Sequence, residues 1–162
     1  MIVEDGTGVT GANALISVAE FNQFASDRNI DPTNYDTEQI EGSIVTASVD
    51  YIDTYFTIKG DSLTTTQGMQ IPTDAVGVES NIKLACYQAA LLNLKGRLFV
   101  DPSELELNGQ IISERDKLDV LETEKEYKEG GNYTYKFPTV SVDRLLQPFA
   151  VNSGGLGDVK RW

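Results

Sequence analysis

The chain has 162 residues, 40% of them hydrophobic, and its 25 acidic and 13 basic side chains give a formal net charge of −12. This length suits one domain that buries a core without disulfides or metals. The negative charge disfavours broad affinity for nucleic-acid phosphates or anionic lipids. The sequence has no histidine and one cysteine, which effectively excludes hydrolytic triads and structural zinc. No run approaches the roughly 18 apolar residues of a membrane helix, and no export signal is expected at the amino terminus.

An extended amino-terminal arm precedes the first predicted helix. Three of its glycines, Gly6, Gly8 and Gly11, have the spacing of the dinucleotide-binding fingerprint, in which backbone amides and a helix terminus hold a pyrophosphate. That motif requires a preceding strand and a helix that begins at once, whereas the chain leaves room for a strand of only about four residues. The sequence therefore favours a turn-rich arm over a Rossmann loop.

The first predicted helix begins at Ser17, its N-cap. Glu20 stands three residues later, as in a capping box, and Ile16 and Phe21 are placed to form a hydrophobic staple. The helix is expected to run to about Asn29.

A second, longer helix is predicted to begin after Asp36, with Gln39 completing its cap, and to run through Ile58 until Gly60 ends it. Apolar residues recur in it at three- and four-residue steps, which predicts a broad buried face. They form two adjacent rows: Ile40, Ile44, Ala47, Tyr51, Tyr55 and Ile58, and Val45, Val49, Ile52 and Phe56.

Asp50 and Asp53 share one face of this long helix, one turn apart. Such a pair could act as general acid and base, or hold a divalent cation. A solvated helix face is the favoured interpretation, so the sequence assigns no catalytic, cofactor-binding or metal-binding residue.

Residues 61–77 contain three consecutive threonines, two glycines and a proline, which predicts a long irregular loop. The helix that follows, to about Val100, is apolar nearly all round and is expected to lie centrally, with Cys86 as a small core residue. Its two rows are Ile82, Ala85, Ala89, Leu92, Gly96 and Phe99, and Tyr87, Leu91, Leu94 and Leu98.

The last third of the chain is predicted to be a β-hairpin over about 108–128, turning near 115–117, then a short helix over about 139–148 capped by Thr139. The hairpin could pack on its own helices or pair with a neighbouring subunit, because a lone hairpin is marginal in water. The predicted fold is mainly α, a small bundle of about four helices with this hairpin and extended terminal arms. One domain covers 1–150, with its helical core over about 17–100, and a flexible tail covers 151–162.

Three segments carry a resemblance to a known family: IVTASVDYIDTYF, GDSLTTTQGMQIPT and VESNIKLACYQAALLNLKGRL. In this order they resemble the head–tail connector (adaptor) family of tailed phages, some members of which are labelled DnaT-like single-stranded-DNA-binding proteins. Further segments near both ends extend the resemblance to about three quarters of the chain. The sequence departs from the family where Ile71, Pro72 and Thr73 replace a common Trp-Pro-Arg step, and where Val78 and Glu79 replace an Ile-Pro pair.

The resemblance implies a structural virion protein without enzymatic activity or cofactor. Such a protein assembles in the host cytoplasm as a ring, of twelve subunits in the family, and docks on the portal protein at the neck of the virion. There it links the DNA-filled head to the tail or the next neck protein, and it forms part of a channel that double-stranded DNA passes without specific binding. No membrane contact is expected.

Partner contacts are predicted in two places. The glycine-rich tail ends with apolar and basic side chains of the kind favoured at interfaces, although a disordered end is the alternative, and the long loop offers a second contact. The predicted interface residues are Leu156, Val159, Lys160, Arg161 and Trp162 in the tail, and Gln67, Met69 and Ile71 in the loop. The competing hypothesis is a single-stranded nucleic-acid-binding protein, and an enzyme is third.

Overall fold

The computed structural model describes residues 1–99, 111–117, 122–127 and 139–151. Contacts divide the chain into two compact units. The first, here called the body, consists of Met1–Leu98 and Pro138–Trp162. The second unit, Phe99–Phe137, is inserted in the sequence between these two segments. The body contains α1 (Val18–Ser26), α2 (Thr37–Val45), the π-helix η1 (Thr46–Asp53), α3 (Ser80–Leu94), α4 (Val140–Leu146) and the short 3-10 helix η2 (Gln147–Phe149). It is a small, mainly α domain, as predicted.

Both predicted capping boxes are present. The Ser17 hydroxyl accepts from the Glu20 amide, and the Glu20 carboxylate accepts from the Ser17 amide at 2.7 Å. Asp36 and Gln39 make the same reciprocal pair at the start of α2. Local sequence therefore determines where these two helices begin.

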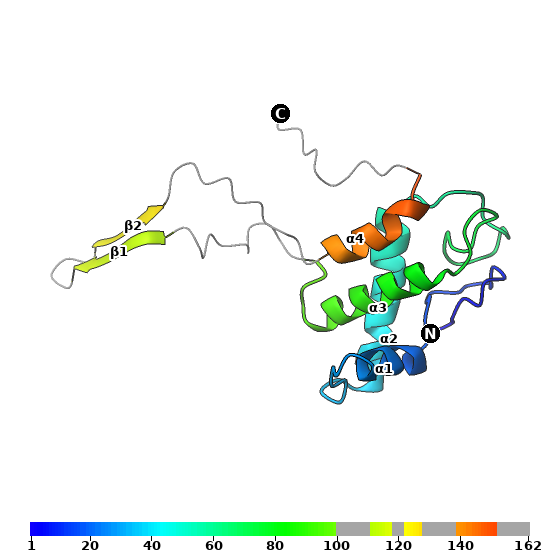
Figure 1. The fold of residues 1–162 in the computed structure, drawn as a ribbon, viewed down its shortest axis with the longest axis horizontal. Helices are drawn as coiled ribbons and strands as arrows, with labels where there is room; N and C mark the ends of the chain where they lie inside the picture. The colour runs from blue at the N-terminus through cyan, green and yellow to red at the C-terminus, as the bar shows by residue number, and fades with distance from the viewer. Residues whose placement is uncertain (100–110, 118–121, 128–138, 152–162) are drawn as a thin grey trace. The chain divides into compact units, whose positions relative to one another are not determined.

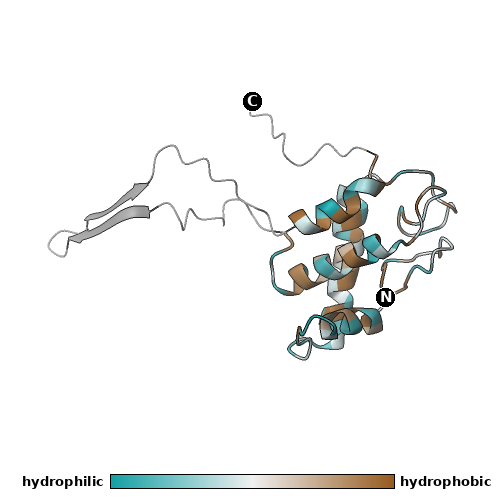
Figure 2. Ribbon diagram, viewed as in Figure 1, coloured by the Kyte–Doolittle hydropathy of each residue, from teal (hydrophilic) through white to brown (hydrophobic). Residues whose placement is uncertain are grey.

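Helix α3 lies at the centre of the body, as its apolar sequence predicted. It packs against α2, η1 and α4, and Figure 1 shows it crossing in front of the column that α2 and η1 form. Brown apolar residues run through all of these helices in Figure 2. Cys86 is fully buried and its sulfur lies 3.3 Å from the Ser48 hydroxyl, so its predicted place in the core is confirmed. Burial raises the pKa of the Cys86 thiol to about 12, which makes it unreactive near neutral pH.

The long second helix is not a regular α-helix. After Val45 it continues as the π-helix η1, and the helical stretch ends at Tyr55 instead of Ile58. A π-helix has more residues per turn than an α-helix, so the α-helical spacing that placed Tyr55 in a buried row fails there, and Tyr55 is 59% exposed. Ile58 is buried as predicted, but in an extended segment that pairs with Ala150.

The central helix is also shorter than predicted. Its last residue is Leu94, and Gly96 adopts the positive φ that commonly ends a helix. Phe99, which was predicted to continue an apolar row, lies beyond this end and is 49% exposed.

Helix α4 closes the body, and its predicted position is confirmed. Val142 and Leu146 are fully buried, and the Tyr51 hydroxyl donates to the Asp143 carboxylate at 2.5 Å. Burial raises the pKa of Asp143, although the hydrogen bond from Tyr51 acts in the opposite direction. Beyond η2 the backbone pairs with the segment after η1, where the Val151 amide donates to the Thr57 carbonyl at 2.8 Å.

The second unit contains β1 (Ile111–Lys117) and β2 (Glu122–Tyr127), which pair antiparallel with Glu114 in register with Lys125. The turn predicted near 115–117 is wrong, because these residues belong to β1. Residues 118–121, which would join the strands, lie outside the described residues. The hairpin over 108–128 therefore stays a prediction.

The body is expected to fold without the inserted unit, because every core residue that the structure describes lies in the body. Replacement of residues 100–137 by a flexible glycine-serine linker should preserve its helical circular dichroism and cooperative thermal unfolding, with a melting temperature within a few degrees of the full chain. Loss of cooperative unfolding in the shortened chain would contradict this division.

Candidate functional site

The loop of the amino-terminal arm that contains Gly6, Gly8 and Gly11 binds the side chain of Glu4 through its backbone amides. The Glu4 carboxylate, 2% exposed, accepts from the backbone amides of Gly6, Gly8 and Val9 at 3.0, 2.9 and 2.8 Å. Gly6, Gly8 and Gly11 all have positive φ, the conformation that glycine adopts without strain. In the dinucleotide-binding fingerprint such backbone amides bind a phosphate, whereas here they donate to the Glu4 carboxylate of the same chain. Sequence reasoning missed Glu4 because one acid near a terminus gives no periodic signal.

This arm is joined to the long loop between η1 and α3. The Gly11 amide donates to the Thr66 carbonyl, and the Thr64 hydroxyl donates to the Gly8 carbonyl at 3.2 Å. Gly68 lies so close to the arm that a Cβ atom there would stand 2.1 Å from the Ala12 carbonyl oxygen. Two segments that are far apart in sequence therefore form one continuous region of the body.

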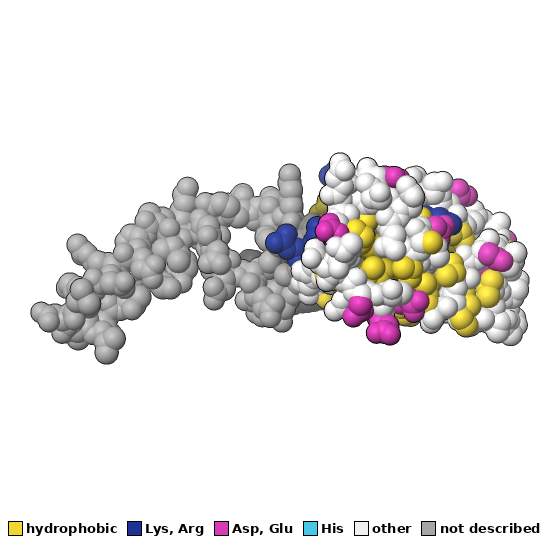
Figure 3. All heavy atoms as spheres, turned by 90° about the horizontal axis from the view of Figure 1, so that it is seen from below, with side chains coloured by type: hydrophobic (Ala, Val, Ile, Leu, Met, Phe, Trp, Pro, Cys, Tyr) yellow, Lys and Arg dark blue, Asp and Glu magenta, His cyan; other side chains and the backbone are white. Residues whose placement is uncertain are grey.

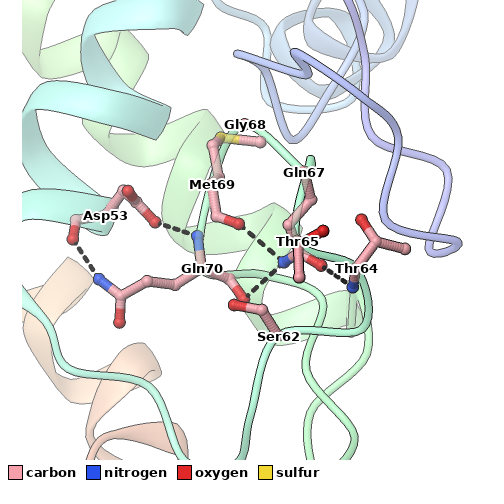
Figure 4. A pocket seen from close by; sticks show the side chains of 8 residues that line it. All are labelled: Asp53, Ser62, Thr64, Thr65, Gln67, Gly68, Met69 and Gln70. Atoms are coloured by element: carbon pink, nitrogen blue, oxygen red, sulfur yellow. Dashed lines mark hydrogen bonds between the residues drawn. The ribbon is translucent and has the colours of Figure 1, made fainter.

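Two glutamine side chains organise the long loop, and Figure 4 shows both beside a shallow hollow. Gln67 donates through its amide nitrogen to the carbonyls of Met69, Gln70 and Pro72 at 2.8 to 3.1 Å. It also accepts from the Thr64 amide at 3.0 Å. Gln67 was predicted to contact a partner, but these four bonds give it a structural role inside the loop.

Gln70 attaches the loop to the end of the preceding helix. Its side chain donates to the Asp53 carbonyl at 2.6 Å and accepts from the Ile58 amide at 3.2 Å. Its backbone amide donates to the Asp53 carboxylate at 2.6 Å. Burial raises the pKa of Asp53, although the amide hydrogen bond lowers it. The loop therefore satisfies carbonyls that the helix end leaves unpaired.

The hollow next to these residues, of about 470 Å³, is open to solvent. It is lined by Asp53, Ser62, Thr64, Thr65, Gln67, Gly68, Met69 and Gln70. Its polar groups are largely bonded to one another, so it offers neutral hydrogen-bonding groups and a carboxylate but no pair of groups placed for acid–base chemistry.

Two other loop residues predicted to contact a partner are buried. Met69 and Ile71 are 5% and 2% exposed and belong to the hydrophobic core. The loop folds back on the body and places both side chains in its core, and their contact with a partner stays a prediction. The five predicted tail residues lie outside the described residues: Leu156, Val159, Lys160, Arg161 and Trp162.

The Asp50 and Asp53 pair does not form. Both residues lie in η1, where the wider π-helical turn no longer stacks residues that are three apart. Asp50 is exposed, whereas Asp53 is bonded to Gln70. Among the described residues, no group of three or more His, Cys, Asp or Glu side chains could hold a metal ion. Within the same ranges, no helix has both the length and the apolarity needed to span a bilayer.

Several basic side chains of the body are engaged with its own groups. Lys83 pairs with Glu20 at 2.6 Å, Lys59 donates to the Pro148 carbonyl at 2.8 Å, and the Arg28 guanidinium lies 4.0 Å from the centre of the Phe24 ring. Phe24 in turn stacks on Tyr87. Figure 3 shows acidic side chains around an apolar area on one face, with few basic ones. This face thus shows no continuous basic groove of the kind that binds single-stranded nucleic acid.

Comparison with known proteins identifies the family. A family model described as "Putative DnaT-like ssDNA binding protein" matches residues 1–161. The chain belongs to this DnaT-like family. No curated protein and no solved structure matches it. The match spans both the body and the inserted unit of this DnaT-like protein, including Glu4 and the two loop glutamines.

The Glu4→Gln variant should lose about 1–3 kcal/mol of unfolding free energy, because a buried amide replaces one acceptor oxygen with a donor that faces a backbone N–H. Chemical denaturation monitored by circular dichroism measures the loss. Asp5→Asn is the matched control, since the Asp5 carboxylate is exposed and bonds only locally to Thr7. Equal stability of the Glu4→Gln variant and the wild type would contradict the structural role of this carboxylate.

The Glu20 and Lys83 pair predicts a pH dependence. Burial tends to raise the pKa of Glu20, but hydrogen bonds from Lys83 and Ser17 lower it below its ordinary value of 4.5. The pair therefore contributes stability above about pH 4.5, and that contribution is lost as the pH falls through the folded-state pKa. Both side chains are about a third exposed, so the contribution should be at most about 1 kcal/mol.

Glu20→Gln isolates this effect, because glutamine also completes a capping box. The unfolding free energy of the variant should fall less between pH 5 and pH 3 than that of the wild type, as measured by urea denaturation at each pH. Lys83→Met should flatten the same curve, and an unchanged slope in both variants would refute the assignment.

Proposed function

We propose that this chain is a structural virion protein, a head–tail connector that forms a ring, docks on the phage portal protein and links the DNA-filled head to the tail. By the family resemblance the ring has twelve subunits, lies at the neck of the virion and encloses part of the DNA channel. It assembles in the host cytoplasm and catalyses no reaction.

The observation that carries this proposal is the division of the chain into two units. The second unit, Phe99–Phe137, is shorter than the roughly 40 residues below which a chain seldom buries a stable core alone. Its strands β1 and β2 pair only with each other among the described residues, and an isolated two-stranded sheet is marginal in water. Pairing of these strands with a neighbouring subunit supplies the missing partner.

The polar groups of the body support the same proposal. Glu4, Asp53, Gln67 and Gln70 are all bonded inside the body, which suits a scaffold better than a reaction site. Residues 1–60 carry ten acidic and two basic side chains. An acidic wall repels the phosphates of passing DNA and keeps the DNA from adhering to the channel.

The second candidate function is single-stranded DNA binding, which the description of the DnaT-like family favours. Such binding requires a basic groove with aromatic side chains on which bases stack. Phe24 is buried, with the Arg28 guanidinium over its ring and Tyr87 stacked on it, so this ring is not available to a base. The net charge of −12 also has the wrong sign, and the connector is therefore preferred.

Electron microscopy of the purified protein mixed with the phage portal protein tests the proposal. We expect a ring of this chain stacked on the portal ring, and we expect deletion of residues 154–162 to abolish the complex while the body stays folded. A full-length chain that never binds the portal would refute the connector. Binding of an oligothymidine to the free protein at physiological salt, measured by fluorescence anisotropy, would support the second function instead.

A further inference from the structure

A glycine in the middle of α2 has no explanation inside the body. Gly42 is exposed, and a Cβ atom added to it would meet nothing within 4 Å. Its φ is not positive, so the backbone does not require glycine, and glycine destabilises a helix interior relative to alanine. A glycine that the fold does not need leaves room for close approach of another backbone or side chain from outside.

Gly42 lies on the outer face of α2. Glu38, Gly42 and Val45 follow one another at four- and three-residue steps, which places them on one side of the helix. Ile40 and Ile44, on the opposite side, are buried in the core. Glu38 is exposed and Val45 is partly exposed, so this outer face begins acidic and becomes apolar.

The outer face of α3 has the reverse order. Leu84, Gln88 and Leu91 lie on one side of this helix and its C-cap residue, Lys95, follows them, while Ala85, Cys86 and Ala89 face the core and are fully buried. Leu84 and Leu91 are partly exposed, and Lys95 and nearby Arg97 are exposed. This face therefore begins with two leucines on either side of Gln88, the second of which also contacts the core, and it ends basic.

The two faces match when the helices run antiparallel. The step from Glu38 to Gly42 equals the step from Lys95 to Leu91, each about 6 Å along a helix. With Glu38 opposite Lys95, the Leu91 side chain lies over the space that Gly42 leaves, and Val45 falls opposite Gln88, one turn before Leu91. Within the part of the chain that the structure describes, Glu38, Glu41, Lys95 and Arg97 form no ion pair.

One chain cannot make this contact with itself. The inner faces of α2 and α3 pack on each other, and the Asn93 side chain donates to the Ser43 hydroxyl at 2.9 Å. The outer faces therefore point to opposite sides of the body. A contact between the α2 face of one copy and the α3 face of another is heterologous, and repetition of such a contact produces a ring or a filament.

We propose that the outer face of α2 in one copy of this chain packs antiparallel on the outer face of α3 in the next copy. The inference rests on the proposed ring and names the surface through which its subunits meet. A single helix pair covers only part of the roughly 1,600 Å² of a standard stable interface, so the body alone should associate weakly.

Charge exchange tests the pairing in the absence of portal protein. The variants Glu38→Lys with Glu41→Lys, and Lys95→Glu with Arg97→Glu, should each self-associate at least tenfold more weakly than the wild type in sedimentation equilibrium. An equimolar mixture should recover association, because each mutant face then meets a complementary one. Asp27→Lys with Asp61→Lys makes the same change in net charge as the Glu38 and Glu41 variant, away from the face, and should associate like the wild type.

Gly42→Leu separates assembly from folding. Leucine favours the helix and has open space around it, so the melting temperature of the monomer should rise by about 2–4 °C, while self-association should weaken at least tenfold. Circular dichroism verifies that every variant is folded.

Three results would overturn the inference: a wild type that stays monomeric up to about 1 mM, a Gly42→Leu variant that associates normally, or a mixture that fails to recover association. None of these results depends on the portal. Failure of this interface is therefore distinguishable from failure of the connector function.

Discussion

The body is arranged around a helix that is apolar on almost every side. A helix of this kind is stable in water only when neighbours cover most of its surface, and α2, η1 and α4 provide that cover for α3. The remaining elements follow from this requirement. The capping boxes begin α1 and α2 at the correct residues, and the long loop returns the chain from η1 to the start of α3.

Sequence predicted the features that depend on local interactions. The caps at Ser17 and Asp36, the central place of α3, the burial of Cys86 and the short helix after Thr139 are all confirmed. Each arises from residues that are close in sequence or from an apolar pattern with a regular period.

Features that depend on contacts between distant segments were missed. The π-helix η1 invalidated the α-helical spacing that had placed Tyr55 in the core. The burial of Met69 and Ile71 depends on a loop that Gln67 holds from within and that Gln70 ties back to Asp53 and Ile58. The local sequence has no signal for a glutamine that accepts a hydrogen bond from one segment and donates one to another. Composition therefore predicted a loop at residues 61–77 but not the hydrogen bonds that fix its conformation.

The insertion of the second unit between α3 and α4 has a mechanical consequence. Both ends of Phe99–Phe137 join the body at helices that pack directly on each other. A force that pulls on that segment therefore acts on the contact between α3 and α4. It does not unfold the body by pulling one chain terminus away. At the α4 end the load is borne by the buried Val142 and by the bond from Tyr51 to Asp143. The Asp143 carboxylate, which accepts from the hydroxyls of Tyr51 and Thr139 next to the buried Val142, thus lies where tension on the inserted segment would enter the helical body.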